Sequence, residues 1–210
     1  MSSMIKLQPE ELFFLGEIMQ AEYIDYSYIE AMGDIQARFA VIKKEAIASL
    51  GEKGLVKESI SGRLRVRPLA EELCGPIFFG PKETVAVVFR NGKRQEAYTK
   101  FFHFKEEDIT CVTMENGILK IEKTDLKEIE DYANTLFDTA ASNPSEISKM
   151  NFHDVTDIIK IKSGVVRVGA KSKTWCISDG VLFGGDCDDD PVVVRVEQAK
   201  TDAVRLLKGE

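Results

Sequence analysis

The pattern of apolar and polar positions repeats one arrangement twice, a short strand followed by a helix. Residues 118–122 alternate apolar and polar side chains and lead into residues 125–132, where apolar side chains recur at helical spacing. Residues 193–197 and 201–207 repeat this order near the C-terminus. A period of two thus gives way twice to a period of about 3.6, the patterns of a half-buried strand and an amphipathic helix. The repetition predicts a molecule built from two related halves.

The first third of the chain has the pattern of helices. Residues 8–11, Gln-Pro-Glu-Glu, are typical of a helix start, with proline in the first turn and acids near the positive end of the helix dipole. A second helix is predicted over residues 34–50, with Asp34 as its N-cap and Phe39 facing inward. A shorter helix is predicted around residues 69–73, ending at Gly75-Pro76.

The middle of the chain has the pattern of an antiparallel meander. Its turns include Asn91-Gly92 and Asn116-Gly117, dipeptides preferred where a tight hairpin needs positive φ. The predicted strands are residues 84–90, 96–104, 108–114 and 118–122, followed by a helix over residues 125–140. Short turns between successive strands favour antiparallel pairing. The expected fold class is therefore α+β, a central antiparallel β-sheet flanked by helices, with a pseudo-twofold internal repeat.

The second half is shorter. A short helix around residues 153–159 is expected first, and a terminal helix last. Between them, strands are predicted near residues 165–168, 173–177, 181–183 and 191–196. Residues 142–145, Ser-Asn-Pro-Ser, best fit a linker. The predicted division is therefore an N-terminal half, residues 1–142, and a C-terminal half, residues 143–210, together forming one compact unit.

Length and net charge limit the kinds of protein that this chain can be. A chain of 210 residues can bury a substantial core. The net charge of −7 argues against nucleic-acid or anionic-membrane surfaces, which need clustered lysine and arginine, although it leaves room for a local basic patch. Without a signal peptide or a long apolar stretch, we expect a cytoplasmic protein with no membrane insertion. Cys74, Cys111, Cys176 and Cys187 are then expected to be reduced, structural thiols.

Motifs for chemistry are weak in this sequence. Residues 186–190 carry aspartates at alternate positions like a calcium loop, but Pro191 stands where that loop needs glycine, so we expect a solvated acidic turn. His103 and His153 lie in different halves, and the alternation around His103 predicts a surface or rim position. Zinc spacing, nucleophile motifs and glycine-rich phosphate loops are absent from the sequence. We therefore expect no catalytic, metal or cofactor site, and a protein that is not an enzyme.

Neighbouring aromatic residues favour bulky side chains on both faces of the sheet. Phe78-Phe79 and Phe101-Phe102 each direct adjacent rings to opposite sides. Such a sheet is either covered on both faces or offers one face to a partner, and the sequence leaves both readings open. An aromatic sheet face can also pair with its own copy, so the chain is expected to be a monomer or a homodimer.

A winged-helix DNA reader is the alternative function. Residues 50–56, followed by Arg63, Arg65 and Arg67 at alternate positions, are typical of a recognition helix that leads into a wing lying on phosphates. Against this, the preceding helix carries few basic or base-reading side chains, its basic residues being Arg38, Lys43 and Lys44. A winged-helix-like transcriptional regulator is therefore kept as the second hypothesis, and a protein that binds another protein is the first.

The order of these elements resembles the EspG-like secretion chaperones of type VII (ESX) systems, and more closely their shorter relatives in Firmicutes. The resemblance rests on residues 7–12, residues 46–56, residues 66–73 and the recurring strand–helix ending. In that family two halves share a central antiparallel sheet, which agrees with the repeat described above. This chain departs from the mycobacterial members in its shorter second half.

The resemblance implies a non-enzymatic, cytoplasmic chaperone or adaptor for a helical type VII secretion substrate. Such a client is a helical hairpin whose apolar tip would aggregate if it were left exposed. No cofactor and no nucleic acid are implied. We expect the partner contact at a sheet face near Phe101, Phe104 and Trp175 and at the terminal helix around Val204 and Leu207, residues that would serve equally well as core.

Overall fold

The computed structural model describes residues 4–91, 95–141, 150, 152–165, 169–185 and 191–210. The strands in this part of the chain are β1 Met4–Leu7, β2 Val56–Glu58, β3 Leu64–Val66, β4 Lys82–Asn91, β5 Gln95–Lys105, β6 Asp108–Glu115, β7 Ile118–Thr124, β8 Val155–Val165, β9 Gly169–Ser178, β10 Val181–Gly185 and β11 Val192–Val193. The helices are α1 Pro9–Met19, α2 Tyr26–Ala31, α3 Phe39–Glu52, α4 Pro68–Phe79, α5 Leu126–Thr135 and α6 Val196–Lys208.

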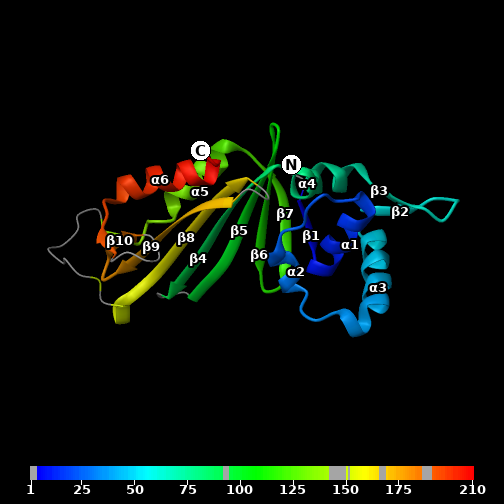
Figure 1. Ribbon diagram of the computed structural model, residues 1–210, viewed down its shortest axis with the longest axis horizontal. Helices are drawn as coiled ribbons and strands as arrows, with labels where there is room; N and C mark the ends of the chain where they lie inside the picture. Colours follow the sequence, from blue (N-terminus) through cyan, green and yellow to red (C-terminus); the bar gives the residue numbers. More distant parts are fainter. Residues whose placement is uncertain (1–3, 92–94, 142–149, 151, 166–168, 186–190) are drawn as a thin grey trace. The chain divides into compact units, whose positions relative to one another are not determined.

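A large antiparallel sheet organises these elements. In the described residues its order is β1-β7-β6-β5-β4-β8-β9-β10-β11, and β2 pairs with β3 in a separate hairpin (Figure 1). Read outward from its centre, the sheet consists of two four-stranded meanders, β4 to β7 and β8 to β11, and a helix follows each, α5 and α6. The predicted α+β class with its internal repeat is thereby confirmed. Asn116 and Gly117 both have positive φ, as their hairpin predicted.

The chain packs as two compact units. Unit 1 comprises Met1–Pro81 and His103–Lys123, and unit 2 comprises Lys82–Phe102 and Thr124–Glu210. The linker predicted at residues 142–145 lies outside the described residues. The halves 1–142 and 143–210 therefore stay a prediction.

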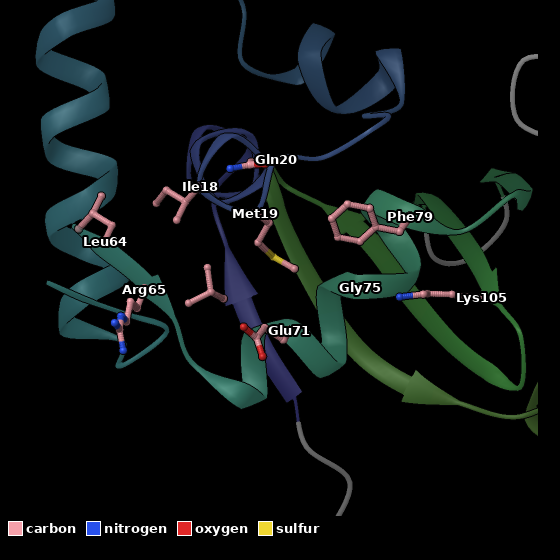
Figure 2. A pocket seen from close by; sticks show the side chains of 10 residues that line it. Ile18, Met19, Gln20, Leu64, Arg65, Glu71, Gly75, Phe79 and Lys105 are labelled. Carbon is pink, nitrogen blue, oxygen red and sulfur yellow. The ribbon is translucent and has the colours of Figure 1, made fainter. Parts of the chain in front are cut away.

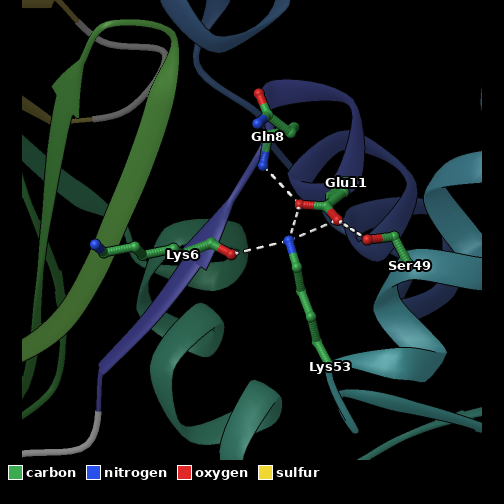
Figure 3. A network of polar contacts seen from close by, with 5 residues as sticks. All are labelled: Lys6, Gln8, Glu11, Ser49 and Lys53. Atoms are coloured by element: carbon green, nitrogen blue, oxygen red, sulfur yellow. Dashed lines mark hydrogen bonds and ion pairs between the residues drawn. The ribbon is translucent and has the colours of Figure 1, made fainter.

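A nearly buried carboxylate, Glu11, ties three elements of unit 1 together. Its Oε2 accepts from the backbone N–H of Gln8 at 2.6 Å, closing the capping box at the start of α1. Its Oε1 accepts from Ser49 Oγ at 2.5 Å, and Lys53 Nζ lies 2.7 and 2.6 Å from the two oxygens (Figure 3). Lys53 also donates to the Lys6 carbonyl of β1 at 3.0 Å. One carboxylate therefore fixes α1 against the end of α3 and against β1.

The end of α4 and the start of α3, both in unit 1, differ from the prediction. Helix α4 continues through Pro76 to Phe79, because the following Ile77 and Phe78 are buried and this burial outweighs the missing proline N–H. Asp34 does not cap α3. Its carboxylate accepts from the N–H of Gln36, and α3 begins at Phe39. The Phe39 ring packs edge-on against Phe14 with 5.3 Å between centroids, while 39% of the residue stays exposed.

His103, expected at the surface, is buried in unit 1. Its Nε2 lies 2.8 Å from the hydroxyl of Tyr28, a residue of the short helix α2 that the sequence did not predict. Burial lowers the pKa of His103 from 6.5 to about 4, and the negative charge of Asp25 opposes this shift in part. Neutral His103 is therefore a hydrogen-bonded core residue.

In unit 2, helices α5 and α6 lie against one face of the sheet (Figure 1). Two contacts fix the end of α6 on β4: Thr84 Oγ1 donates to the Leu207 carbonyl at 2.9 Å, and Lys82 Nζ donates to the Lys208 carbonyl at 2.7 Å. Ala199 and Ala203 are fully buried, and their small side chains allow the helix to pack closely.

Three predictions in unit 2 were wrong. The strand predicted near residues 191–196 is limited to Val192–Val193, because α6 already begins at Val196. Residues 153–159 form the start of β8 after a single 3-10 turn, Phe152–Asp154, because Asp157, Ile159 and Ile161 alternate inward along a strand. Helix α5 ends at Thr135 instead of residue 140. None of the helices in the described part of the chain combines the length and the apolar character needed to cross a bilayer.

No disulfide joins the cysteines of the described residues. Cys74 and Cys111 are buried and Cys176 is half-buried, while Cys187 lies outside the described ranges. Burial raises the pKa of the Cys74 thiol to about 12 and also raises the pKa of Cys176. A high pKa keeps these thiols protonated and weakly reactive.

Replacing Glu11 by Ala is expected to lower the free energy of unfolding by about 2–3 kcal/mol, because Gln8 and Ser49 lose their acceptor and Lys53 loses its partner. Urea denaturation followed by circular dichroism measures this. Glu17→Ala is the matched control, since the Glu17–Lys43 ion pair joins the same two helices at an exposed position and is worth about 0.5 kcal/mol or less. Equal losses in the two variants would contradict the role of Glu11.

Acid is expected to destabilise the protein through His103. In the unfolded chain this residue binds a proton below about pH 6.5, whereas in the folded chain it binds one only below about pH 4. The free energy of unfolding therefore falls as the pH falls through this window. The total loss is about 3 kcal/mol. Denaturation at several pH values should show a smaller fall for His103→Gln than for the original chain. The same fall in both would contradict this explanation.

Candidate protein-binding surface

The candidate surface is the face of the unit 2 sheet opposite α6. Side chains alternate along β4, so Thr84, whose hydroxyl reaches α6, shares its face with Ala86 and Val88, and both of these are buried. Val87 and Phe89 point the other way and are 42% and 44% exposed. The strand therefore carries apolar side chains on both faces, and helices cover one of them.

Strand β8 extends this face. In the antiparallel register, Phe89 lies opposite Ile158, Val87 opposite Lys160 and Val85 opposite Lys162. Ile158 is 40% exposed, whereas Ile159 and Ile161 on the other face are buried. We call these six residues, Val85, Val87, Phe89, Ile158, Lys160 and Lys162, the open face.

The open face has an apolar end and a basic end. Phe89 and Ile158 form a cross-strand pair at one end, and the next residue in their row is half-buried Cys176 on β9. Lys160 and Lys162 stand at successive positions toward the other end. Clustered apolar side chains in water cost free energy that a covering partner recovers. This surface can bind another molecule by contact alone.

The residues predicted to contact a partner lie mainly in the core. Phe101, Phe104, Trp175 and Leu207 are buried, and Val204 is half-buried. Within unit 2, the Trp175 ring packs edge-on against Phe137 with 5.4 Å between centroids. Burial places these side chains against their own chain. It does not test partner binding, and their role in it stays a prediction.

Sequence reasoning missed the residues of the open face. The signal in β4 was present, since residues 84–90 are bulky at successive positions and not only at alternate ones. Val87, Val88 and Phe89 are consecutive bulky residues, the same pattern that predicts side chains on both faces at Phe101-Phe102. Ile158 was not predicted as an exposed strand residue, because its segment was predicted to be a helix.

A hollow in unit 1 is a second concave feature (Figure 2). It has a volume of about 510 Å³ and lies between α1, β3 and α4, with apolar walls that include Met19, Leu64 and Phe79. Glu71, Arg65 and Lys105 supply its charges, and Lys105 Nζ lies 5.4 Å from the centroid of the Phe79 ring. Its chemistry is that of an apolar hollow with charged edges.

Metal binding and DNA binding find no support in the described residues. These contain no group of three or more His, Cys, Asp or Glu side chains placed to hold a metal ion, and the acidic residues 186–190 lie outside them. The predicted wing exists as the β2–β3 hairpin. Yet Lys43 Nζ on the preceding helix lies 2.7 Å from Glu17 Oε2, and this ion pair neutralises part of the positive charge of that helix.

Comparisons with known proteins show the fold. No protein-family model matches the chain, and no curated protein matches its sequence. The chain is similar in structure to the Mycobacterium tuberculosis type VII secretion system chaperone EspG5, solved in complex with the PE25–PPE41 dimer. The TM-score is 0.64 at 7% sequence identity, and the match covers 98% of this chain and 96% of that chain.

Trp175→Ala is expected to lower the free energy of unfolding by about 3–5 kcal/mol, because it leaves a large cavity beside Phe137. Thermal denaturation measures the change. Val193→Ala on the exposed strand β11 is the control and should alter stability little. A Trp175→Ala variant with unchanged stability that fails to bind a partner would instead support a direct contact.

Proposed function

We propose that the protein is a non-enzymatic chaperone or adaptor that binds a helical type VII secretion substrate. In this proposal the open face covers an apolar patch on the client and keeps the client soluble until it is secreted. The client is a helical hairpin, and the complex forms in the cytoplasm. Binding alone accounts for the activity.

The exposed apolar pair Phe89 and Ile158 is the observation that carries this proposal. It stands on a sheet whose fold matches that of EspG5, a secretion chaperone that was solved with a protein dimer bound. The likeness in fold supports the proposal of a related role. The open face is the surface in this chain to which that role is assigned.

Burial of the apolar end of the open face would supply part of the free energy of a complex. Covering Val87, Phe89 and Ile158 would remove roughly 200 Å² of apolar surface from water, worth about 5 kcal/mol before the costs of association. Aromatic residues at the centre of such patches dominate measured binding energies. Phe89 is therefore the anchor residue in this proposal, and the neighbouring backbone is held rigid by the β4–β8 ladder.

Charge at the other end of the open face indicates what the client should carry. Lys160 and Lys162 lie in successive rows next to the apolar pair. An apolar client surface bordered by carboxylates would be complementary to this arrangement, and the attraction would speed association at low salt. The proposed partner is thus a helical segment with an apolar tip and acidic residues beside it.

Affinity purification of the tagged protein from its native host, with identification by mass spectrometry, tests the proposal. We expect recovery of one small helical secretion substrate in a stoichiometric complex. In calorimetry with that purified client, Phe89→Ala should weaken binding at least tenfold, because truncating the aromatic anchor of the apolar end costs about 1.4 kcal/mol or more.

Phe39→Ala is the matched control, since Phe39 is 39% exposed on α3 and lies outside the open face. Its affinity for the client should equal that of the original chain, and circular dichroism should show both variants folded. Equal weakening by the two substitutions, or recovery of no helical secretion substrate, would contradict the proposal.

A further inference from the structure

The β2–β3 hairpin of unit 1 displays a fully exposed isoleucine at its tip. Figure 1 shows the hairpin projecting beyond the helices of unit 1. The Ile60 side chain is entirely accessible to solvent, more than any other large apolar side chain in the described residues. Such exposure carries a cost in water and contributes nothing to the core.

The tip presents Ile60 in a fixed geometry. The Gly62 N–H donates to the Ser59 carbonyl at 2.9 Å, which closes a turn with Ile60 at its second position. Ser59 N–H donates to the Arg63 carbonyl at 2.8 Å, and Arg63 N–H donates to Ser59 Oγ at 3.1 Å. Gly62 has φ +74°, the conformation that a three- to five-residue hairpin loop commonly requires. None of these turn contacts needs an isoleucine.

One face of the hairpin is basic. Arg65 lies directly opposite Lys57 in the register, and the period of two places Arg63 and Arg67 on the same face. All four side chains are exposed, and none forms a hydrogen bond or an ion pair within the described part of the chain. Like charges directly opposite each other destabilise a hairpin, and an anionic partner removes that cost.

The other face of the hairpin turns toward its own unit. Val56 is buried, and Leu64 and Val66 are half-buried against the hollow shown in Figure 2. Of the four basic residues, only Arg65 borders that hollow, and all four are exposed, so the basic face is turned outward. A hollow of about 700 Å³ on the hairpin is lined by Ile60, by the basic residues Lys57, Arg65 and Arg67, and by one acid, Glu58, so basic groups outnumber acidic ones beside the apolar tip.

We propose that this hairpin docks the protein on an anionic lipid bilayer, with Ile60 inserted among the acyl chains and the basic face on the headgroups. The pairing of an apolar tip with a basic flank distinguishes this surface from a nucleic-acid site, because phosphates and sugars offer an isoleucine side chain no apolar environment. The overall charge of −7 argues against a broad anionic-membrane surface, but the hairpin is a local basic patch, and attraction to the headgroups acts within about a Debye length. The inference does not depend on the proposed function.

Sedimentation with lipid vesicles tests the inference. The full chain should bind vesicles containing about 30% phosphatidylserine in about 0.1 M salt, and should bind neutral phosphatidylcholine vesicles far more weakly. Arg63→Gln and Arg65→Gln should each lower the partition coefficient about fivefold. Ile60→Ser should lower it severalfold by removing the inserted side chain.

Leu126→Ser on α5 is the matched control, since this leucine is also exposed but lies in unit 2, and it should bind vesicles like the original chain. Circular dichroism confirms that each variant is folded. Failure to bind anionic vesicles, or binding unaffected by Ile60→Ser, would overturn the inference. Binding to duplex DNA that depends on Arg65 and not on Ile60, with no binding to vesicles, would also overturn it and assign the basic face to nucleic acid.

Discussion

The register of β4 against β8 is the constraint on which unit 2 depends. Pairing Val88 with Ile159 and Phe89 with Ile158 decides which side chains lie under α6 and which meet solvent. A shift of one residue would exchange the two faces of the moved strand, burying Phe89 or Ile158 and exposing core residues. The contact of Thr84 with the end of α6 fixes which face of β4 is covered, because the hydroxyl reaches its carbonyl acceptor only from that face. Core and open face are thus two results of one pairing.

In unit 1, polar contacts supplement an apolar core that includes Leu12, Leu15 and Leu73. The Glu11 carboxylate, held by Lys53 and Ser49, fixes the helices from which the β2–β3 hairpin extends. The hairpin in turn buries Val56 and leaves its arginines outward. The two units therefore display different chemistry: a flat apolar row bordered by lysines in unit 2, and a basic hairpin with an apolar tip in unit 1. The first suits a folded partner, and the second suits an anionic surface.

The sequence predicted elements where local pattern and tertiary packing agree, as in the meander around Asn116-Gly117. It failed where burial by distant residues overrides local preference. His103 was predicted to be a rim residue, because the sequence did not predict helix α2, whose Tyr28 is its buried hydrogen-bond partner. Ile158 was missed because a short apolar run fits a helix or a strand equally well until the pairing with β4 is known. Of the candidate surface, the sequence could indicate bulky residues on both sheet faces, but not which face the helices leave open.

Photo-cross-linking from the open face tests the central claim most directly. A photoreactive phenylalanine analogue at position 89, introduced in the native host, should form an adduct with one helical secretion substrate, mapped to an apolar segment bordered by acidic residues. The same analogue at position 39, a phenylalanine of similar exposure, should form no such adduct. Equal adducts from both positions, or none from position 89 while the complex is intact, would show that the open face is not the surface that binds the client.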